Sequence, residues 1–542
     1  MLFNSPVFIA GFLPICLAGF YCFGMMGRQQ LALAWLTGMS LVFYGWWNVA
    51  FVPLLVGSIA FNFLLGRLLA RSPSKRLLLI GVLGNVLLLG VFKYTGFVGH
   101  SINEIFGTTW HIPEIALPLA ISFFTFQQIA FLADTYDGVA EEPQALQYSL
   151  FITFFPHLIA GPITHHREML PQFNDRGILR PRLDLISTGA TVFLAGLFKK
   201  VIIADGVAAY AKPVFEAAAH GAAPSLLEAW GGALAYAMQI YFDFSGYSDM
   251  AIGLGLLFGI SLPLNFASPY KAASIIEYWQ SWHMTLTRFL TAYIFTPIVL
   301  ALTRKRLAAG KPVLRPGRTS LSTFLVLLAG PTMVTMFVSG VWHGAGWQFI
   351  IFGLLHGVFL TINHGWRTLK SRWKWWRDLG LRSVRHAASV LTTFLCATLA
   401  LVFFRSADVP TAMRIVEGMI GWNGAALPDL FDRIPVLRAA SQALHLPIST
   451  LPFFSVHELY WLPILFWIVW FMPNVEQWMR HYRTALNAKL RAIWYEGWIL
   501  DGTPLAVWRP TVACGCIVSA IGLFALLKAF SHAPTEFLYF KF

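Results

Sequence analysis

One residue that could do chemistry is a histidine placed inside an apolar stretch. His343 lies in the string Val-Trp-His-Gly-Ala-Gly-Trp, residues 341–347, between two long apolar runs. Polar side chains at membrane depth are costly to bury and usually serve a function. The alternative is a packed, hydrogen-bonded histidine, as for many buried imidazoles. A second histidine, His283, follows Trp282 in a similar setting, and this second occurrence favours the functional interpretation.

The composition places both histidines in a membrane protein. Hydrophobic residues make up 57% of the 542 residues and charged residues 12%, whereas an ordinary soluble domain carries about 25% charged residues. Stretches of about 20 apolar residues, long enough to cross a bilayer as helices, lie near 5–25, 30–48, 50–70, 77–98, 115–133, 186–203, 228–243, 246–262, 285–303, 321–342, 346–365, 387–404, 455–472 and 510–531. We expect an all-α polytopic protein with about 11 to 15 membrane helices. The first run lacks the basic start of a signal peptide and should be retained.

The net charge of +14 resides in short loops between the apolar runs. The basic groups are Arg71, Lys75 and Arg76; Arg167, Arg176, Arg180 and Arg182; Arg304 through Arg318; Arg367 through Arg385; and Arg480 through Arg491. The positive-inside rule makes these loops cytoplasmic, which puts the N-terminus, the 405–454 loop and the C-terminal tail outside. Cations distributed in this way argue against nucleic-acid binding. Residues 372–377, Arg-Trp-Lys-Trp-Trp-Arg, fit an amphipathic segment at the cytoplasmic headgroups.

Other features limit the class of function. The run 148–163 is short and broken by Pro156, Gly161 and Pro162, so we expect a re-entrant or tilted piece there. The five cysteines lie inside apolar runs without metal-ligand spacing, and no metal site is expected. The sequence lacks an evident repeat or duplication of two halves, which disfavours a transporter.

Several polar strings in the middle of the chain occur in a characteristic order. They are Pro118 through Gln127, Phe154 through Ile163, Gly196 through Lys200, Tyr241 through Asp249, Asn265 through Tyr270, Trp279 through His283 and Val341 through Trp347. In this order they resemble the membrane-bound O-acyltransferase family, in particular its bacterial branch of alginate O-acetylation and teichoic acid D-alanylation proteins. The resemblance covers roughly residues 110–365 closely. It divides the chain into N-terminal membrane helices (1–110), a catalytic core with a funnel or tunnel (111–365) and C-terminal membrane helices (366–542) that include the 405–454 loop.

The resemblance implies that His343 is the essential histidine and that Trp282 and His283 supply the second characteristic polar position. The chemistry is acyl transfer from a thioester to a hydroxyl, in which an imidazole accepts the hydroxyl proton near neutral pH. A base contributes about 10²- to 10⁴-fold in rate, so positioning and oxyanion stabilisation must supply the rest. Gly344 and Gly346 either let a substrate approach or let helices pack closely, and both interpretations stay open.

The expected substrate-binding residues are polar side chains of the middle strings and the two tryptophans that precede the histidines. They are Gln127, Asp243, Ser245, Tyr247, Trp282 and Trp342. We expect the string from Asp243 to Asp249 to be a helix break that lines a polar cavity, with Asp249 capping a helix over 250–259. A metal site made by this string alone is disfavoured, because the two carboxylates would not share one helix face. Lys199 and Lys200 fit either coenzyme A phosphates or cytoplasmic anchoring.

The aromatic tail at 537–542, Phe-Leu-Tyr-Phe-Lys-Phe, follows the last apolar run. Such a tail can form an interfacial aromatic belt. It also resembles the aromatic-tyrosine tail of alginate-type and peptidoglycan-type acetylation proteins, which implies insertion into the outer funnel with Tyr539 close to the active histidine. A phenol can accept an acyl group and pass it on, and would thus connect a cytoplasmic donor with an outer acceptor.

The sequence therefore predicts an inner-membrane O-acyltransferase that moves an acetyl group from cytoplasmic acetyl-coenzyme A outward to a polysaccharide. Alginate, cellulose, peptidoglycan and other exopolysaccharides are all possible acceptors. We expect an extracytoplasmic partner resembling a serine esterase to complete the transfer, and no bound cofactor. The alternatives are D-alanyl transfer to a teichoic acid-like polymer, which the fused tail disfavours, and a non-enzymatic transporter of a lipid-linked glycan.

Overall fold

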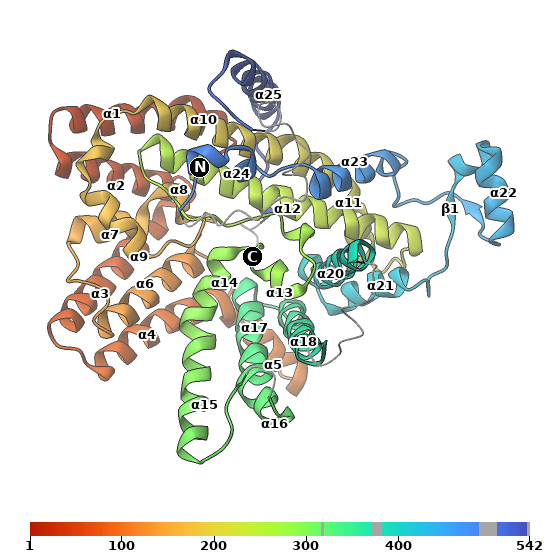
Figure 1. Cartoon of the computed structure of the whole chain (residues 1–542), viewed down its shortest axis with the longest axis horizontal. Coiled ribbons are helices and arrows are strands. Elements are labelled where there is room, and N and C mark those ends of the chain that lie inside the picture. The colour runs from red at the N-terminus through yellow and green to blue at the C-terminus, as the bar shows by residue number, and fades with distance from the viewer. Residues whose placement is uncertain (316–318, 371–381, 487–506, 539–542) are drawn as a thin grey trace. The chain divides into compact units, whose positions relative to one another are not determined.

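The computed structural model describes residues 1–315, 319–370, 382–486 and 507–538, and almost every element in them is a helix (Figure 1). Eight of these helical segments are long and apolar enough to cross a membrane: Val7–Met25, Val49–Arg71, Lys75–Phe106, Met284–Ala308, Leu321–His343, Trp347–Leu369, Ser383–Arg405 and Val512–Ser531. The expected all-α polytopic fold is confirmed. Other apolar stretches form shorter helices. Helix α23 (Glu458–Phe471), for example, has 14 residues and reaches only about 21 Å, less than the ~30 Å of the hydrocarbon layer.

The chain forms two compact units that each combine segments distant in sequence. The first unit consists of residues 1–202, 243–267 and 473–542, and the second of residues 203–242 and 268–472. Helix α12 (Leu226–Leu257) contributes residues to both. The other elements of the first unit are η1 (Val7–Phe12), α1 (Leu13–Met25), α2 (Gln29–Gly45), η2 (Val49–Phe51), α3 (Val52–Arg71), α4 (Lys75–Leu89), η3 (Gly90–Tyr94), α5 (Thr95–Phe106), α6 (Ile121–Tyr136), α7 (Ala145–Thr153), α8 (Phe155–Leu158), α9 (His166–Asn174), η4 (Arg176–Leu179), α10 (Leu183–Phe198), the start of η5 (Lys199–Ala204), α24 (Val475–Trp478), η10 (Arg480–Tyr482) and α25 (Val512–Ser531).

The second unit carries the histidines singled out from the sequence. Besides α23, its elements are α11 (Asp205–Ala219), η6 (Pro269–Lys271), α13 (Ile275–Trp279), α14 (Met284–Leu290), η7 (Thr291–Phe295), α15 (Thr296–Ala308), α16 (Leu321–Phe324), η8 (Leu325–Ala329), α17 (Gly330–His343), α18 (Trp347–Lys370), α20 (Arg382–Arg405), α21 (Val409–Met419), β1 (Leu427–Pro428), η9 (Asp429–Arg433), α22 (Pro435–Ala443) and β2 (Ile448–Ser449). Strands β1 and β2 pair in parallel and, with α22, form a small module within the 405–454 loop, at the right of Figure 1.

The predicted helix break between Asp243 and Asp249 is wrong, because helix α12 is continuous there. Its 32 residues run through this string without interruption, so Asp249 lies inside the helix and does not cap one. The reason is close packing against α10. A Cβ atom on Gly196 would lie 2.5 Å from the Gly246 carbonyl oxygen, and one on Gly246 would lie 2.8 Å from the Gly196 oxygen. Two backbones that touch at glycines support each other as regular helices.

A buried amide cluster joins α3, α4 and α6. The Asn62 side chain donates to Gln128 Oε1 at 2.6 Å, and the Asn85 side chain donates to Asn62 Oδ1 at 2.6 Å. All three side chains are buried. Hydrogen bonds between helices fix their register in an apolar environment. The cluster therefore fixes α6, which also carries Gln127.

Candidate active site

His343 is the last residue of α17, at a point where two helices meet closely. The chain becomes extended at Gly344 and then enters α18. A Cβ atom on Gly340 would lie 2.4 Å from the Phe349 carbonyl oxygen, so only glycine permits this separation of α17 and α18. The tight contact fixes the end of α17 and therefore the position of the imidazole.

The imidazole of His343 is buried among aromatic rings. Its ring centroid lies 4.9 Å from that of Trp342, 5.6 Å from Phe352 and 5.2 Å from Phe404, each at an interplanar angle between 69° and 86°. Phe352 belongs to α18 and Phe404 to α20. Rings from three helices thus hold the imidazole in edge-to-face contacts and exclude water from much of its surface.

His283 lies next to the same tryptophan. Its ring centroid is 6.0 Å from that of Trp342, so Trp342 contacts both histidines. His283 is fully buried and precedes α14 with a φ of 42°, in the left-handed region. A side chain in this region carries backbone strain, which is often found at functional sites. The structure therefore places His283, Trp342 and His343 next to one another. With Phe352 and Phe404 we call them the histidine cluster.

His356 on α18, another buried histidine of the second unit, was not predicted from the sequence. Its Nδ1 accepts a hydrogen bond from Trp279 Nε1 at 3.2 Å, and its ring stacks on Tyr278 at 5.9 Å. Tyr278 also stacks on Trp282, with centroids 5.7 Å apart. Phe352 contacts the His356 ring at 4.8 Å and thereby connects it to the histidine cluster. The rule that singled out His343, a polar residue in an apolar run, would have found His356 too.

The two glycines after His343 have different surroundings. A Cβ atom on Gly344 would lie 2.2 Å from the Phe349 ring, whereas one on Gly346 would meet the end of the flexible Gln348 side chain at 2.4 Å. The space beside Gly344 is thus filled by a ring. This observation supports the packing interpretation for Gly344.

Asp243 and Asp249, the two carboxylates of the predicted polar string, lie in the first unit and form ion pairs with two lysines. Lys200 Nζ lies 2.8 Å from Asp243 Oδ1, and each side chain is 2% exposed. Lys199 Nζ lies 2.5 Å from Asp249 Oδ2. The π-helical η5 begins at these lysines and directs both toward α12. Both lysines are thus bound to carboxylates, and Lys200 is too buried to meet coenzyme A phosphates or to anchor a cytoplasmic surface.

Glu536 and the first two residues of the aromatic tail lie against this buried ion pair. The Leu538 N–H donates to Asp243 Oδ2 at 3.0 Å, and Lys200 Nζ donates to the Glu536 carbonyl oxygen at 3.0 Å. The Phe537 ring lies 4.9 Å from Lys200 Nζ and 4.6 Å from the Tyr247 ring. We call Lys200, Asp243 and Tyr247 the tail site. Tyr539 itself lies outside the described residues.

The remaining predicted residues are also in the first unit. Ser245 is buried, and its hydroxyl has no hydrogen-bond partner among the described residues. Gln127 is buried and donates from Nε2 to Thr164 Oγ1 at 2.9 Å. The predicted substrate-binding set is therefore divided: Trp282 and Trp342 accompany the histidines, and the other members belong to the first unit.

One further cluster in the first unit offers metal-ligating atoms. Asp134, His165 and His166 place such atoms within 4.8 Å of one another. His165 Nδ1 accepts the Arg167 N–H at 3.3 Å, and Nε2 lies 2.7 Å from Asp134 Oδ2. Because Nδ1 accepts, the neutral ring carries its proton on Nε2, the atom that a metal would need. Burial, with a contribution from His165, lowers the pKa of His166 to about 4. We assign the cluster to capping of α9.

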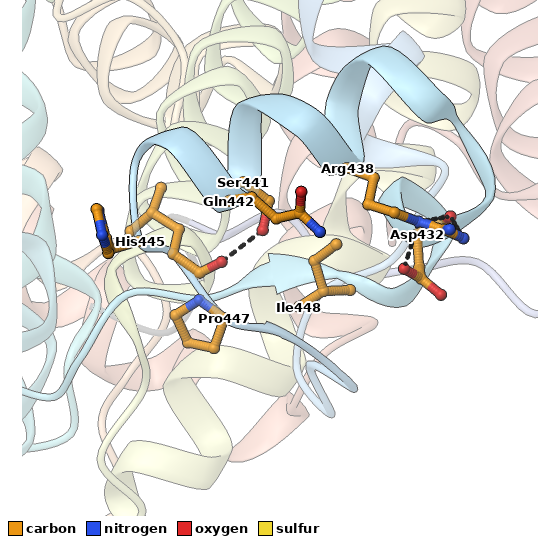
Figure 2. A pocket seen from close by; sticks show the side chains of 8 residues that line it. Asp432, Arg438, Ser441, Gln442, His445, Pro447 and Ile448 are labelled. Atoms are coloured by element: carbon orange, nitrogen blue, oxygen red, sulfur yellow. Dashed lines mark hydrogen bonds and ion pairs between the residues drawn. The ribbon is translucent and has the colours of Figure 1, made fainter.

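The module in the 405–454 loop contains an open hollow of about 590 Å³. It is lined by Asp432, Arg438, Ser441, Gln442, His445, Leu446, Pro447 and Ile448, and Figure 2 shows this pocket from close by. The ion pair between Arg438 Nε and Asp432 Oδ1 spans 2.9 Å, and Ser441 Oγ donates to the Leu446 oxygen at 2.6 Å (Figure 2). These polar groups satisfy one another at an exposed surface, so the hollow is not a candidate catalytic centre.

A family model and several known proteins are similar to this chain. Residues 138–404 match the family model of MBOAT, the membrane-bound O-acyltransferase family. The chain is 40% identical over 460 residues to a peptidoglycan O-acetyltransferase of Helicobacter pylori, which covers 79% of this chain and 82% of the relative. It is 35% identical over 477 residues to a probable alginate O-acetylase of Pseudomonas aeruginosa, covering 86% and 83%. It is also 28% identical over 297 residues to a teichoic acid D-alanyltransferase of Bacillus subtilis, covering 54% and 69%.

Proposed function

Because this chain belongs to the membrane-bound O-acyltransferase family, we propose that it moves an acetyl group from cytoplasmic acetyl-coenzyme A outward for O-acetylation of an extracytoplasmic polysaccharide. Membership makes the chain an O-acyltransferase. The acetyl group and the polysaccharide are proposed because the similar proteins include a peptidoglycan O-acetyltransferase and alginate O-acetylases. The basic loops support a bacterial inner-membrane orientation in which both termini face outward.

The observation that carries this proposal is the aromatic enclosure of His343. In the proposed step His343 accepts the proton of a hydroxyl while the hydroxyl oxygen attacks the thioester carbonyl carbon. The carbon–sulfur bond then breaks, and the leaving coenzyme A thiolate takes up the proton from the imidazole. The surrounding rings of Trp342, Phe352 and Phe404 keep the imidazole in one orientation and reduce access of water that would hydrolyse the thioester.

We assign the attacking hydroxyl to Tyr539. Its phenol would form an acetyl-tyrosine ester, and the serine hydroxyl of an extracytoplasmic partner would then take the acetyl group and transfer it to a sugar hydroxyl. The binding of Glu536, Phe537 and Leu538 at the tail site supports this assignment, because it orders the chain immediately before Tyr539. A tail that served only as an interfacial belt would not need a buried ion pair as its binding site.

The proposal is tested by following coenzyme A release from labelled acetyl-coenzyme A in proteoliposomes. His343→Ala should insert and fold normally but lower acetyl transfer at least about 10²-fold, because a general base is lost without burial of a new charge. His386→Ala, which removes an exposed histidine of α20, is the matched control and should keep full activity. Normal transfer by a correctly expressed His343→Ala protein would contradict the mechanism.

The same assay separates the alternative functions. A transporter predicts glycan flux without thioester consumption. A D-alanyl transferase predicts that an activated D-alanine replaces acetyl-coenzyme A as the donor, a possibility raised by the similarity to the teichoic acid D-alanyltransferase. Release of coenzyme A that depends on His343 distinguishes O-acetylation from both.

A further inference from the structure

We propose that Phe3 and Asn4, at the start of the chain, complete the tail site and hold the C-terminal tail in register for acyl transfer. This inference rests on the proposed function of the tail. Neither residue belongs to a recognisable sequence motif. The observation behind it is the meeting of two segments that lie 531 residues apart.

Asn4 binds the main chain two residues before the aromatic tail. Its Nδ2 donates to the Thr535 carbonyl oxygen at 3.2 Å, and the side chain is buried. The other amide atom, Asn4 Oδ1, is buried without a hydrogen-bond partner among the described residues. A buried amide with one unsatisfied atom is unfavourable for folding alone. We therefore attribute Asn4 to tail binding.

Phe3 supports the aromatic part of the same site. Its ring stacks on Tyr247 with centroids 4.8 Å apart and an interplanar angle of 19°. Tyr247 in turn meets the Phe537 ring edge to face at 4.6 Å. Phe3 also contacts Phe8 at 5.0 Å and Phe43 at 5.6 Å, which attaches the N-terminal segment to η1 and α2. Phe3 is thus held by Phe8 and Phe43, and it supports the Tyr247 ring without any contribution from the tail.

Three hydrogen bonds hold the main chain at the start of the tail. Asn4 binds the carbonyl of Thr535, Lys200 binds the carbonyl of Glu536, and Asp243 binds the N–H of Leu538. The Phe537 side chain, 1% exposed, fills the aromatic part of the site. Main-chain contacts at three positions within four residues fix the register of a bound peptide, because a shift by one residue would lose them together. The register determines where the next residue, Tyr539, is placed.

The experiment measures release of the tail by carboxypeptidase digestion of the purified full-length protein, followed by mass spectrometry of its C-terminus. Asn4→Leu keeps the side-chain volume and removes the amide, and should speed removal of residues 535–542 by about 3- to 10-fold, the effect of one lost hydrogen bond on an opening equilibrium. The matched control is Asn103→Leu, which removes another asparagine amide that donates to a main-chain oxygen, that of Trp110, in the same unit. Polysaccharide acetylation should fall in Asn4→Leu and not in Asn103→Leu.

The design separates this inference from the proposed function. If Tyr539→Phe acetylates normally while Asn4→Leu still releases the tail, the carrier role is wrong and the site remains. If the tail of Asn4→Leu is as protected as that of the unchanged protein, the inference is overturned. Phe3→Leu, which keeps an apolar side chain but loses the stacked ring, should also release the tail. This second variant keeps the test valid if Asn4→Leu does not fold. Equal digestion of Phe3→Leu and the unchanged protein would count against the inference as well.

Discussion

The histidine cluster and the tail site are both buried, yet they are built from opposite kinds of residue. The histidine cluster holds two imidazoles among aromatic rings, whereas the tail site is organised around the ion pair of Lys200 and Asp243. Both depend on helices that touch at glycines, Gly340 in one and Gly196 in the other. The roles proposed for the two sites account for this difference. A proton acceptor functions best without a fixed charge that would bias its titration, while peptide groups are bound well by charged donors and acceptors.

The largest expected effect tests the chemical purpose of the tail site. Tyr539→Phe should stop acetyl export while protein level and membrane insertion stay normal, because the ring is kept and only the hydroxyl is lost. An acetyl-tyrosine ester on the C-terminal peptide, detected by mass spectrometry when the partner is absent, would be the expected intermediate. Normal acetylation by Tyr539→Phe would reduce the tail to an anchor and require an acceptor that reaches His343 directly.

The ion pair of the tail site should be essential for stability and for binding, and the two contributions can be separated. Asp243→Asn leaves Lys200 without its carboxylate, and loss of one partner from a buried ion pair costs about 3–5 kcal/mol. The double variant Lys200→Met, Asp243→Leu should recover most of the thermal stability but not acetylation, because it lacks the groups that bind Glu536 and Leu538.

The second ion pair of the same helices is the control for this experiment. Lys199→Met with Asp249→Leu removes a pair of similar geometry. This double variant should also recover thermal stability, but its tail should stay protected from carboxypeptidase. Acetylation at the normal level in the Lys200→Met, Asp243→Leu variant would contradict the comparison between the two sites.

How far these sites could be predicted depends on the range of the interactions that form them. The membrane helices and His343 follow from local apolar runs, and the structure confirms the helical membrane fold. The continuous α12 was missed, because the contact of Gly196 with Gly246 joins positions 50 residues apart that share no sequence pattern. The pairing of Lys200 with Asp243 was missed for the same reason. His356, by contrast, could have been found, because its signal is local.

On the histidine side, His283 should contribute less than His343. His283 occupies the left-handed region, which asparagine tolerates better than alanine does. His283→Asn therefore removes the imidazole with little added backbone strain, and we expect coenzyme A release to fall about 10- to 100-fold with residual activity remaining. His283→Ala should combine this loss with lower thermal stability. Unchanged activity in His283→Asn would return His283 to the role of a packing residue beside Trp342.

The smallest expected effect is a pH dependence of stability in the unit that contains the tail site. Glu476 on α24 is buried, and this burial raises its pKa from 4.5 to about 7, although a hydrogen bond from Thr484 opposes the shift. Between pH 4.5 and about 7 the unfolded chain releases this proton while the folded chain keeps it, so stability falls as pH rises through this window. The total change is at most about 3 kcal/mol. Glu476→Gln cannot ionise, so its thermal unfolding midpoint in detergent should lose this dependence, and it should be increasingly more stable than the unchanged protein up to pH 8. Glu141→Gln, at an exposed position, should follow the unchanged protein. If the unfolding midpoints of Glu476→Gln and the unchanged protein change with pH in parallel, the Glu476 carboxylate is solvated and its pKa is not raised in the folded protein.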